Sequence, residues 1–131
     1  MSRFLLDTHA WAFLHLDRSR IPTGMMQELE TADAIFISPI SAFEIAQKVR
    51  VGKWPEAAHL VGRFPDLIGR DGTQEAPVTA AIALLAGQMD WPHRDPFDRF
   101  LAATAELDDL TLVTMDRVFA TRPGLRTAWE S

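Results

Sequence analysis

Short apolar runs alternate along this chain with longer segments whose apolar residues recur at helical spacing. Three runs typical of strands occupy residues 3–7, 34–38 and 110–114. Such an alternation is typical of βαβ units, in which helices connect the parallel strands of one sheet. The pattern therefore predicts an α/β fold with a mainly parallel sheet.

The remaining elements are predicted from periodicity and from the positions of Gly and Pro. Helices are predicted after the first strand, where Ala10, Phe13 and Leu14 share one face, and at residues 22–32, Ser41 to about Gly52, 56–69, 79–89 and 97–107. Shorter strands are predicted at 73–78 and 125–129, and a loop at 91–96. The chain shows no repeat and no obvious linker, so we expect a single domain covering residues 1–131.

Composition excludes several classes of protein. The 131 residues include no Cys, which excludes a disulfide framework, a thiolate zinc site and a cysteine nucleophile. The net charge of −5 argues against a protein that binds nucleic acid through a broad basic surface. It does not exclude an enzyme that visits nucleic acid briefly, because acids clustered in one site can be neutralised by metal ions. No segment approaches the ~20 apolar residues that cross a bilayer, and an acid at position 7 comes too early for a signal peptide. We expect a cytoplasmic protein with no membrane partner.

Several acids stand where a parallel sheet would bring them together. Asp7 ends the first predicted strand, Glu44 opens the helix after the second, and Asp116 follows the strand at 110–114. Asp95 and Asp98 flank the start of the helix at 97–107. Ligands of open parallel sheets bind outside the carboxyl ends of the strands, an edge shared with the following helix N-termini. We therefore expect these acids to converge in one pocket.

Each acid also has a purely structural explanation. Ser41-Ala42-Phe43-Glu44 matches a capping box, in which the Glu side chain bonds back to the backbone N–H of the Ser. Asp95 followed by Pro matches a helix N-cap, and an acid in the first turn is favoured by the helix dipole. Asp7 and Asp116 can cap the turns that follow their strands in the same way.

The energetics of a convergent group favour a metal site. Two carboxylates about 4 Å apart repel by roughly 4 kcal/mol at an effective dielectric constant near 20. Without a countercharge, one of them takes up a proton. A hard divalent cation removes the repulsion, and Mg²⁺ and Mn²⁺ prefer oxygen ligands. An acid cluster without Cys or paired His therefore indicates Mg²⁺ or Mn²⁺ in place of zinc.

Four stretches of the chain, taken in this order, match the motifs of a known family. They are Leu5-Leu6-Asp7-Thr8-His9, Ser41-Ala42-Phe43-Glu44-Ile45-Ala46-Gln47-Lys48 with Gly52-Lys53, His93-Arg94-Asp95-Pro96-Phe97-Asp98-Arg99, and Leu112-Val113-Thr114-Met115-Asp116. The chain resembles the PIN domain family, and within it the VapC-type ribonuclease toxins of type II toxin–antitoxin pairs. The resemblance covers nearly the whole chain.

The resemblance implies a fold, an activity and partners. The fold would be a three-layer α/β/α sandwich with a mainly parallel sheet of four or five strands. The activity would be that of an endoribonuclease dependent on Mg²⁺ or Mn²⁺, which cleaves RNA phosphodiesters with metal-activated water. The chain would form a homodimer, and a cognate antitoxin would block its site.

Carried over by motif, the resemblance also implies roles for particular residues. Asp7, Glu44, Asp98 and Asp116 would form the catalytic and metal site, with Asp7 and Asp98 holding the principal ion. Asp95 would be an accessory ligand, a support for a ligand, or only a helix cap. Thr8, Thr114 and His9 would support the ligands, and His9 stands where many members of the family have Asn.

Basic and aromatic residues near the same edge are candidates for binding partners. Arg94, Arg99, Arg117 and Lys48 are expected to contact RNA phosphates, and solvated surface charge is their alternative explanation. Trp54 and Trp91 are candidates for stacking on bases, with packing as the alternative. An antitoxin helix would dock near Trp11, Phe13 and Leu14, of which Trp11 is the one expected to be exposed.

Two other functions remain compatible with the sequence. A metal-dependent DNA nuclease of related fold would show the same acids, and cleavage of RNA and DNA oligonucleotides side by side separates the two. A catalytically silent module would keep the fold and the acids for a protein partner. Calorimetric titration with Mn²⁺ discriminates here, because a silent module should show no tight binding that depends on Asp7.

Overall fold

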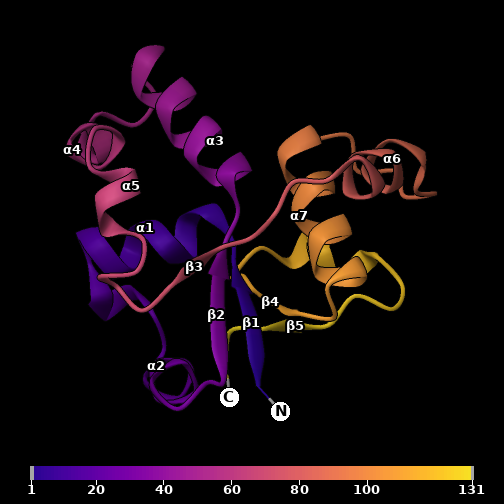
Figure 1. Ribbon diagram of the computed structural model, residues 1–131, viewed down its shortest axis with the longest axis horizontal. Helices are drawn as coiled ribbons and strands as arrows, with labels where there is room; N and C mark the ends of the chain where they lie inside the picture. Colours follow the sequence, from indigo (N-terminus) through magenta and orange to yellow (C-terminus); the bar gives the residue numbers. More distant parts are fainter. Residues whose placement is uncertain (1, 131) are drawn as a thin grey trace.

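A five-stranded parallel sheet forms the centre of the protein. The structure is a computed structural model and describes residues 2–130. Phe4 of the central strand aligns with Ile35 on one side and with Thr111 on the other, and the outer pairs are parallel as well. The predicted parallel sheet is thereby confirmed (Figure 1). The strands are β1 (Arg3–Leu6), β2 (Ala34–Ile37), β3 (Gln74–Glu75), β4 (Thr111–Val113) and β5 (Thr127–Ala128), in the order β3-β2-β1-β4-β5.

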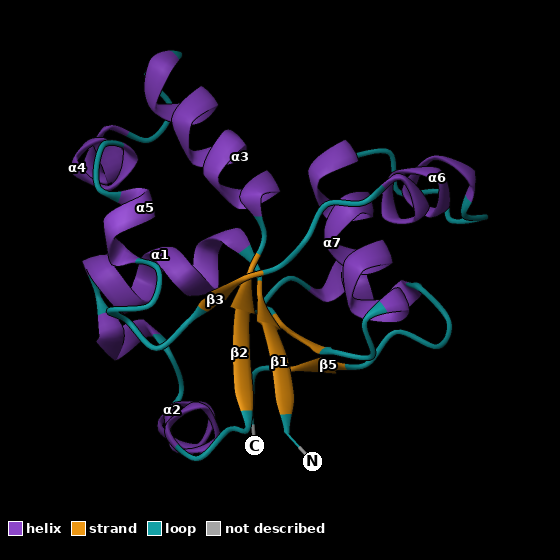
Figure 2. Cartoon of the chain, in the orientation of Figure 1, coloured by secondary structure: helices purple, strands orange, loops and turns teal. Residues whose placement is uncertain are grey.

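Helices cover both faces of this sheet, as a three-layer sandwich requires (Figure 2). On one side lie α1 (Thr8–Leu16), α2 (Thr23–Glu30), α4 (Ala58–Val61) and α5 (Phe64–Leu67), and on the other α6 (Ala80–Gln88) and α7 (Pro96–Leu107). Helix α3 (Pro39–Arg50) rises beyond the carboxyl end of β2 and contacts α1, α4 and α7. The short 3-10 turns are η1 (Arg18–Arg20), η2 (Pro55–Ala57) and η3 (Arg117–Thr121).

The central strand supplies side chains to two separate cores. Phe4 and Leu6 pack into the core under α1 and α2, whereas Leu5 packs into the core under α6 and α7. This division follows from the strand geometry, because successive side chains point to opposite faces of a sheet. Both faces are buried, so the strand reads in the sequence as an unbroken apolar run.

Helix α3 begins earlier than the sequence predicts. Ser38 is its N-cap, because the Ser38 hydroxyl accepts a hydrogen bond of 3.0 Å from the Ile40 N–H, and Pro39 occupies the first helical position. Ser41 therefore lies within the first turn, and the capping box predicted for Ser41 and Glu44 is wrong. The side chain of Glu44 is thereby left available for contacts outside its own helix.

Two other predicted elements are shorter than expected. The helix predicted at 56–69 is divided into η2, α4 and α5, with Gly62 directly after α4 and Pro65 in the first turn of α5. The strand predicted at 73–78 is reduced to the two residues of β3, since Pro77 cannot donate to a strand ladder. Within residues 2–130 no helix is both long enough and apolar enough to cross a bilayer.

Candidate functional site

The acids singled out from the sequence surround one pocket of about 460 Å³ at the carboxyl edge of the sheet. We call it the acidic pocket. Strands β1 and β4 end beside it, and α3 and α7 begin there. The predicted convergence is therefore found, while the roles of the residues stay predictions. The carboxylates in its wall are those of Asp7, Glu44, Asp95, Asp98 and Asp116.

Asp7 follows the end of β1 and is buried in the wall of the acidic pocket. It is 6% exposed, and its Oδ1 accepts a hydrogen bond of 2.7 Å from the Ala10 N–H, so that it caps α1. Burial raises the pKa of Asp7 to about 6, against the hydrogen bonds from the Thr114 hydroxyl and the Ala10 N–H that lower it. The nearby charges of Asp98 and Glu44 raise the pKa of Asp7 further.

Glu44 is also buried, and polar partners occupy both of its carboxylate oxygens. The Thr8 hydroxyl donates to Oε1 at 2.6 Å, and Lys48 Nζ lies 2.9 Å from Oε2. Because Thr8 directly follows Asp7, it ties the end of β1 to α3. Thr8 thus contacts the carboxylate of Glu44, while the supporting roles expected for Thr8 and Thr114 stay predictions. Lys48 pairs with Glu44 and also lines the acidic pocket.

Asp98 lies on the first turn of α7 and is paired with His93, to which the sequence pattern assigned no role of its own. Its Oδ2 lies 2.7 Å from His93 Nε2, and both side chains are partly buried. Burial raises the pKa of Asp98 to about 6, the hydrogen bond from His93 lowers it, and the charge of Asp95 raises it. The sequence feature that could have predicted this pair is the short separation of His93 and Asp98 on either side of Pro96.

Arg99 supports the loop that carries this histidine. Its guanidinium donates hydrogen bonds of 2.7–2.9 Å to four backbone carbonyls. These contacts give Arg99 a structural task in place of the RNA contact predicted for it. They also fix the backbone of His93 relative to α7. The four carbonyls belong to Ala86, Met89, Trp91 and His93.

Asp95 and Asp116 stand at the exposed rim of the acidic pocket, where each caps a helical turn. Asp95 Oδ1 accepts from the Asp98 N–H at 3.1 Å, and Asp116 Oδ1 accepts from the Val118 N–H at 3.0 Å. The structural explanation offered by the sequence is therefore correct for both. It does not compete with ion binding, because a cap uses one oxygen of each carboxylate.

The basic and imidazole groups predicted here differ in their placement. Arg117 and His9 line the acidic pocket, whereas Arg94 is exposed on the loop before α7. The His9 ring stacks on Trp54, with ring centres 4.9 Å apart. Trp91 is buried, and its Nε1 donates a hydrogen bond of 2.9 Å to the Thr121 hydroxyl. This placement supports a packing role for Trp91, the alternative to stacking on a base.

The donor set of the acidic pocket fits a hard divalent cation. Its acidic donors are carboxylate oxygens, which a hard cation prefers, and the His9 imidazole also lies on the wall. Burial and neighbouring acids raise the pKa values of Asp7 and Asp98, so a cation beside them would offset an unfavourable concentration of negative charge. Within residues 2–130, no three His, Asp or Glu side chains are placed so that they could hold an ion directly. Glu44 and Asp98 are instead turned toward Lys48 and His93.

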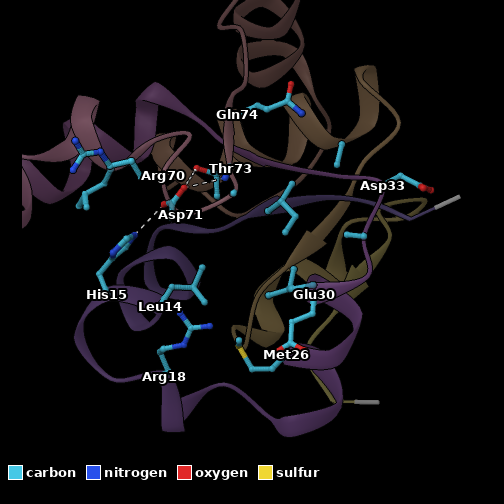
Figure 3. A pocket seen from close by; sticks show the side chains of 16 residues that line it. Leu14, His15, Arg18, Met26, Glu30, Asp33, Arg70, Asp71, Thr73 and Gln74 are labelled. Atoms are coloured by element: carbon cyan, nitrogen blue, oxygen red, sulfur yellow. Dashed lines mark hydrogen bonds and ion pairs between the residues drawn. The ribbon is translucent and has the colours of Figure 1, made fainter.

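A separate cavity of about 590 Å³ lies away from these acids, between α1, α2 and the segment before β3 (Figure 3). Asp71 at its wall accepts hydrogen bonds from Trp11 Nε1 at 2.8 Å and from the Thr73 hydroxyl at 2.6 Å, and His15 Nε2 lies 3.0 Å away. Burial alone would raise the pKa of Asp71, but these hydrogen bonds outweigh it and lower the pKa.

This network also corrects a prediction. Trp11, expected to be exposed for a partner helix, is fully buried, as is most of Phe13. Leu14 is the member of that trio that reaches the wall of the 590 Å³ cavity. Trp11 is buried because its indole packs between α1 and Phe64 of α5, with the centres of the two rings 4.4 Å apart.

Comparison with known proteins gives concordant results. The model of the PIN domain family matches residues 4–125. Ribonuclease VapC22 of Mycobacterium tuberculosis is 28% identical over 117 residues, which cover 89% of each chain. The structure resembles VapBC2 of Rickettsia felis, solved bound to a DNA fragment from its promoter, with a TM-score of 0.69, 19% identity and coverage of 96% and 97% of the two chains. It resembles DNA-bound VapBC of Salmonella typhimurium equally well, with a TM-score of 0.69, 21% identity and 98% of each chain covered.

Proposed function

The chain belongs to the PIN domain family, and from this premise we propose that it is a Mg²⁺- or Mn²⁺-dependent endoribonuclease, the toxin of a VapBC-type toxin–antitoxin pair. The observation that carries the proposal is the acidic pocket, in which Asp7, Glu44, Asp98 and Asp116 meet from four separate parts of the sequence. The relative that is named a ribonuclease supports the choice of RNA as substrate.

Asp7 and Asp98 would hold the principal ion, and Glu44 and Asp116 would complete its surroundings. A bound divalent cation supplies positive charge that activates water and offsets the negative charge that develops on a cleaved phosphate. The chain itself keeps its carboxylates in place. The Ala10 N–H donates to Asp7 Oδ1, and a hydrogen bond from Thr114 lowers the pKa of the same carboxyl.

The other supporting residues act on the remaining acids. Thr8 and Lys48 hold Glu44, and His93 holds Asp98. Asp95 caps the helix that carries Asp98. Arg117 on the pocket wall and Arg94 on the nearby loop are the candidates for contacts with RNA phosphates.

We also propose a protein antitoxin and a homodimer. The solved structures that resemble this chain are of VapBC proteins, which supports an antitoxin partner. A basic side chain from that partner would neutralise the acids of the acidic pocket and so exclude a metal ion and RNA. The protein is expected to act in the cytoplasm, where its substrate lies.

Expression with and without the neighbouring gene tests this function. Expressed alone, the chain is expected to arrest growth and to produce new RNA 5′ ends, and coexpression of the neighbour is expected to relieve both effects. Purified protein should cleave RNA oligonucleotides in Mn²⁺ and spare DNA oligonucleotides of the same sequence. Preferential cleavage of DNA would favour a DNA nuclease. If neither RNA nor DNA is cleaved, a catalytically silent binding module would be favoured.

The raised pKa values of Asp7 and Asp98 predict an unusual dependence of stability on pH. Both carboxyls bind protons more strongly in the folded chain than in the unfolded chain, so the free energy of unfolding should fall as the pH rises from about 4 to about 7. For Asp7, a pKa near 6 in place of 3.8 corresponds to a loss on the order of 2–3 kcal/mol at neutral pH. Urea unfolding in EDTA at several pH values measures this slope.

Mn²⁺ should reverse the loss at pH 7, because an ion that binds only the folded chain stabilises it. The stabilisation by Mn²⁺ should shrink at pH 5, where protons compete for the same oxygens. A pH slope that persists unchanged in Asp7→Asn would show that other groups cause it.

Replacement of His93 by Ala should weaken the ion site without unfolding the chain. The carboxylate of Asp98 would lose the partner that orients it, and such supporting residues typically contribute 10- to 100-fold to metal affinity or activity. Calorimetric titration with Mn²⁺ measures the change directly. His59→Ala is the matched control, since His59 is exposed on α4. Unchanged Mn²⁺ affinity in His93→Ala would mean that the pair with Asp98 is only structural.

A further inference from the structure

A second hollow adjoins the acidic pocket and has the opposite charge. Its volume is about 480 Å³, and it shares three wall residues with the acidic pocket. We call it the basic hollow. Among the described residues, its wall includes no Asp or Glu. The shared residues are His9, Lys48 and Met115, and the basic hollow adds Phe13, Arg20, Lys53 and Trp54.

The aromatic part of the basic hollow is a stacked pair of rings. The imidazole of His9 lies on the indole of Trp54 with ring centres 4.9 Å apart and planes 24° from parallel. His9 is exposed and Trp54 is half-buried, so the pair is held against the protein on one side and is open to solvent on the other. Met115, which is 48% exposed, extends this apolar surface. A flat open ring surface suits stacking by a planar ligand.

Three cations surround the stacked rings in a chain whose net charge is −5. Lys48 Nζ lies 5.7 Å from the centre of the Trp54 ring and is also paired with Glu44. The guanidinium of Arg20 lies 4.2 Å from the centre of the Phe13 ring, which sets its position on the wall. Lys53 is exposed beside Trp54. The basic hollow therefore concentrates positive charge around an aromatic surface, next to a pocket of carboxylates.

We propose that the basic hollow binds single-stranded RNA beside the site of cleavage. One base stacks on the Trp54–His9 pair, and the phosphates of the same strand lie on Arg20 and Lys53. Proteins commonly bind single-stranded nucleic acid with aromatic side chains flanked by cations. The aromatic rings stack on the bases, and the cations pair with the negatively charged phosphates. The shared residues place a neighbouring phosphodiester over the acids. This assignment rests on the proposed ribonuclease function.

Binding of a fluorescein-labelled single-stranded RNA oligonucleotide of mixed sequence, measured by anisotropy in EDTA, tests the proposal without cleavage. Trp54→Ala is expected to weaken binding about 5- to 100-fold, and Trp54→Phe to restore most of it. Arg20→Ala and Lys53→Ala should each weaken binding and reduce the salt dependence, with the slope of log K against log salt falling by about 0.7 per contact.

Arg126→Ala is the matched control, because it removes the same charge from an exposed residue that lines neither the acidic pocket nor the basic hollow. Parental affinity in both Trp54→Ala and Arg20→Ala would overturn the proposal. A Glu-rich peptide of matched charge provides a second test. If it binds more tightly than RNA and loses affinity in the same variants, the proposal is overturned, because the basic hollow then belongs to a protein partner. RNA bound in the basic hollow but never cleaved in Mn²⁺ would contradict the nuclease instead, leaving the binding site in place.

Discussion

The Asp7→Asn variant is expected to lose metal-dependent RNA cleavage by more than about 100-fold. Residues that merely orient a metal ligand contribute 10- to 100-fold, and removal of a ligand itself should cost more. Asn keeps the shape of the side chain and an oxygen that can accept from the Ala10 N–H, so the cap of α1 survives. Cleavage of a labelled RNA oligonucleotide in Mn²⁺ measures the loss.

The same variant should be more stable than the parent chain at pH 7 in EDTA. It removes a negative charge that burial and its acidic neighbours disfavour, as the pKa of about 6 for Asp7 indicates. Loss of activity together with a higher unfolding midpoint separates loss of a metal ligand from loss of the fold. Asp66→Asn is the control, because Asp66 is an exposed acid paired with Arg70. Full cleavage by Asp7→Asn would end the assignment of the acidic pocket as the nuclease site.

The Arg99→Ala variant is expected to lose about 3–5 kcal/mol of unfolding free energy. Four backbone carbonyls would lose a charged donor at once, and each such hydrogen bond contributes about 1.5–3 kcal/mol, with less than full additivity. Arg99→Lys should recover only a small part, since an ammonium group cannot reach four acceptors in the plane of a guanidinium. Urea unfolding measures both effects.

The control for Arg99→Ala is Arg126→Ala, whose exposed pair with Asp109 should contribute little. Loss of Arg99 should also weaken Mn²⁺ binding, because it releases the backbone of His93 and through it the partner of Asp98. If Arg99→Ala unfolds like the parent chain but binds RNA less tightly, the RNA contact inferred from the sequence is the correct role for this residue.

The features that could be predicted from the sequence are those that a local pattern encodes. Residues 4–6 of β1 form an unbroken apolar run because both faces of the sheet are buried, and such a run indicates a parallel sheet. The acids follow strand ends or begin helices, so the topology alone brings them to one edge. Caps such as Asp95 are equally local, because the acid and the N–H it binds are three residues apart.

The features that were missed depend on contacts between distant segments. The capping box offered for Ser41 and Glu44 is wrong, because Ser38 caps the helix and the Glu44 carboxylate is bound by Thr8 of another helix. Trp11 is buried by Asp71 and Phe64, which follow it at a distance in the chain. Arg99 looks like any surface charge until its four carbonyl partners are known.

The pairing of β1 with β4 also governs when a newly made molecule can act. Phe4 lies opposite Thr111, so the central strand acquires its second neighbour only after most of the chain has been synthesised. Contacts between such remote segments form slowly during folding. Asp98 and Asp116 join Asp7 at the same late stage. If the chain is the ribonuclease proposed above, a nascent chain on the ribosome is therefore expected to spare the RNAs around it until residues as far as Asp116 have been synthesised and have folded.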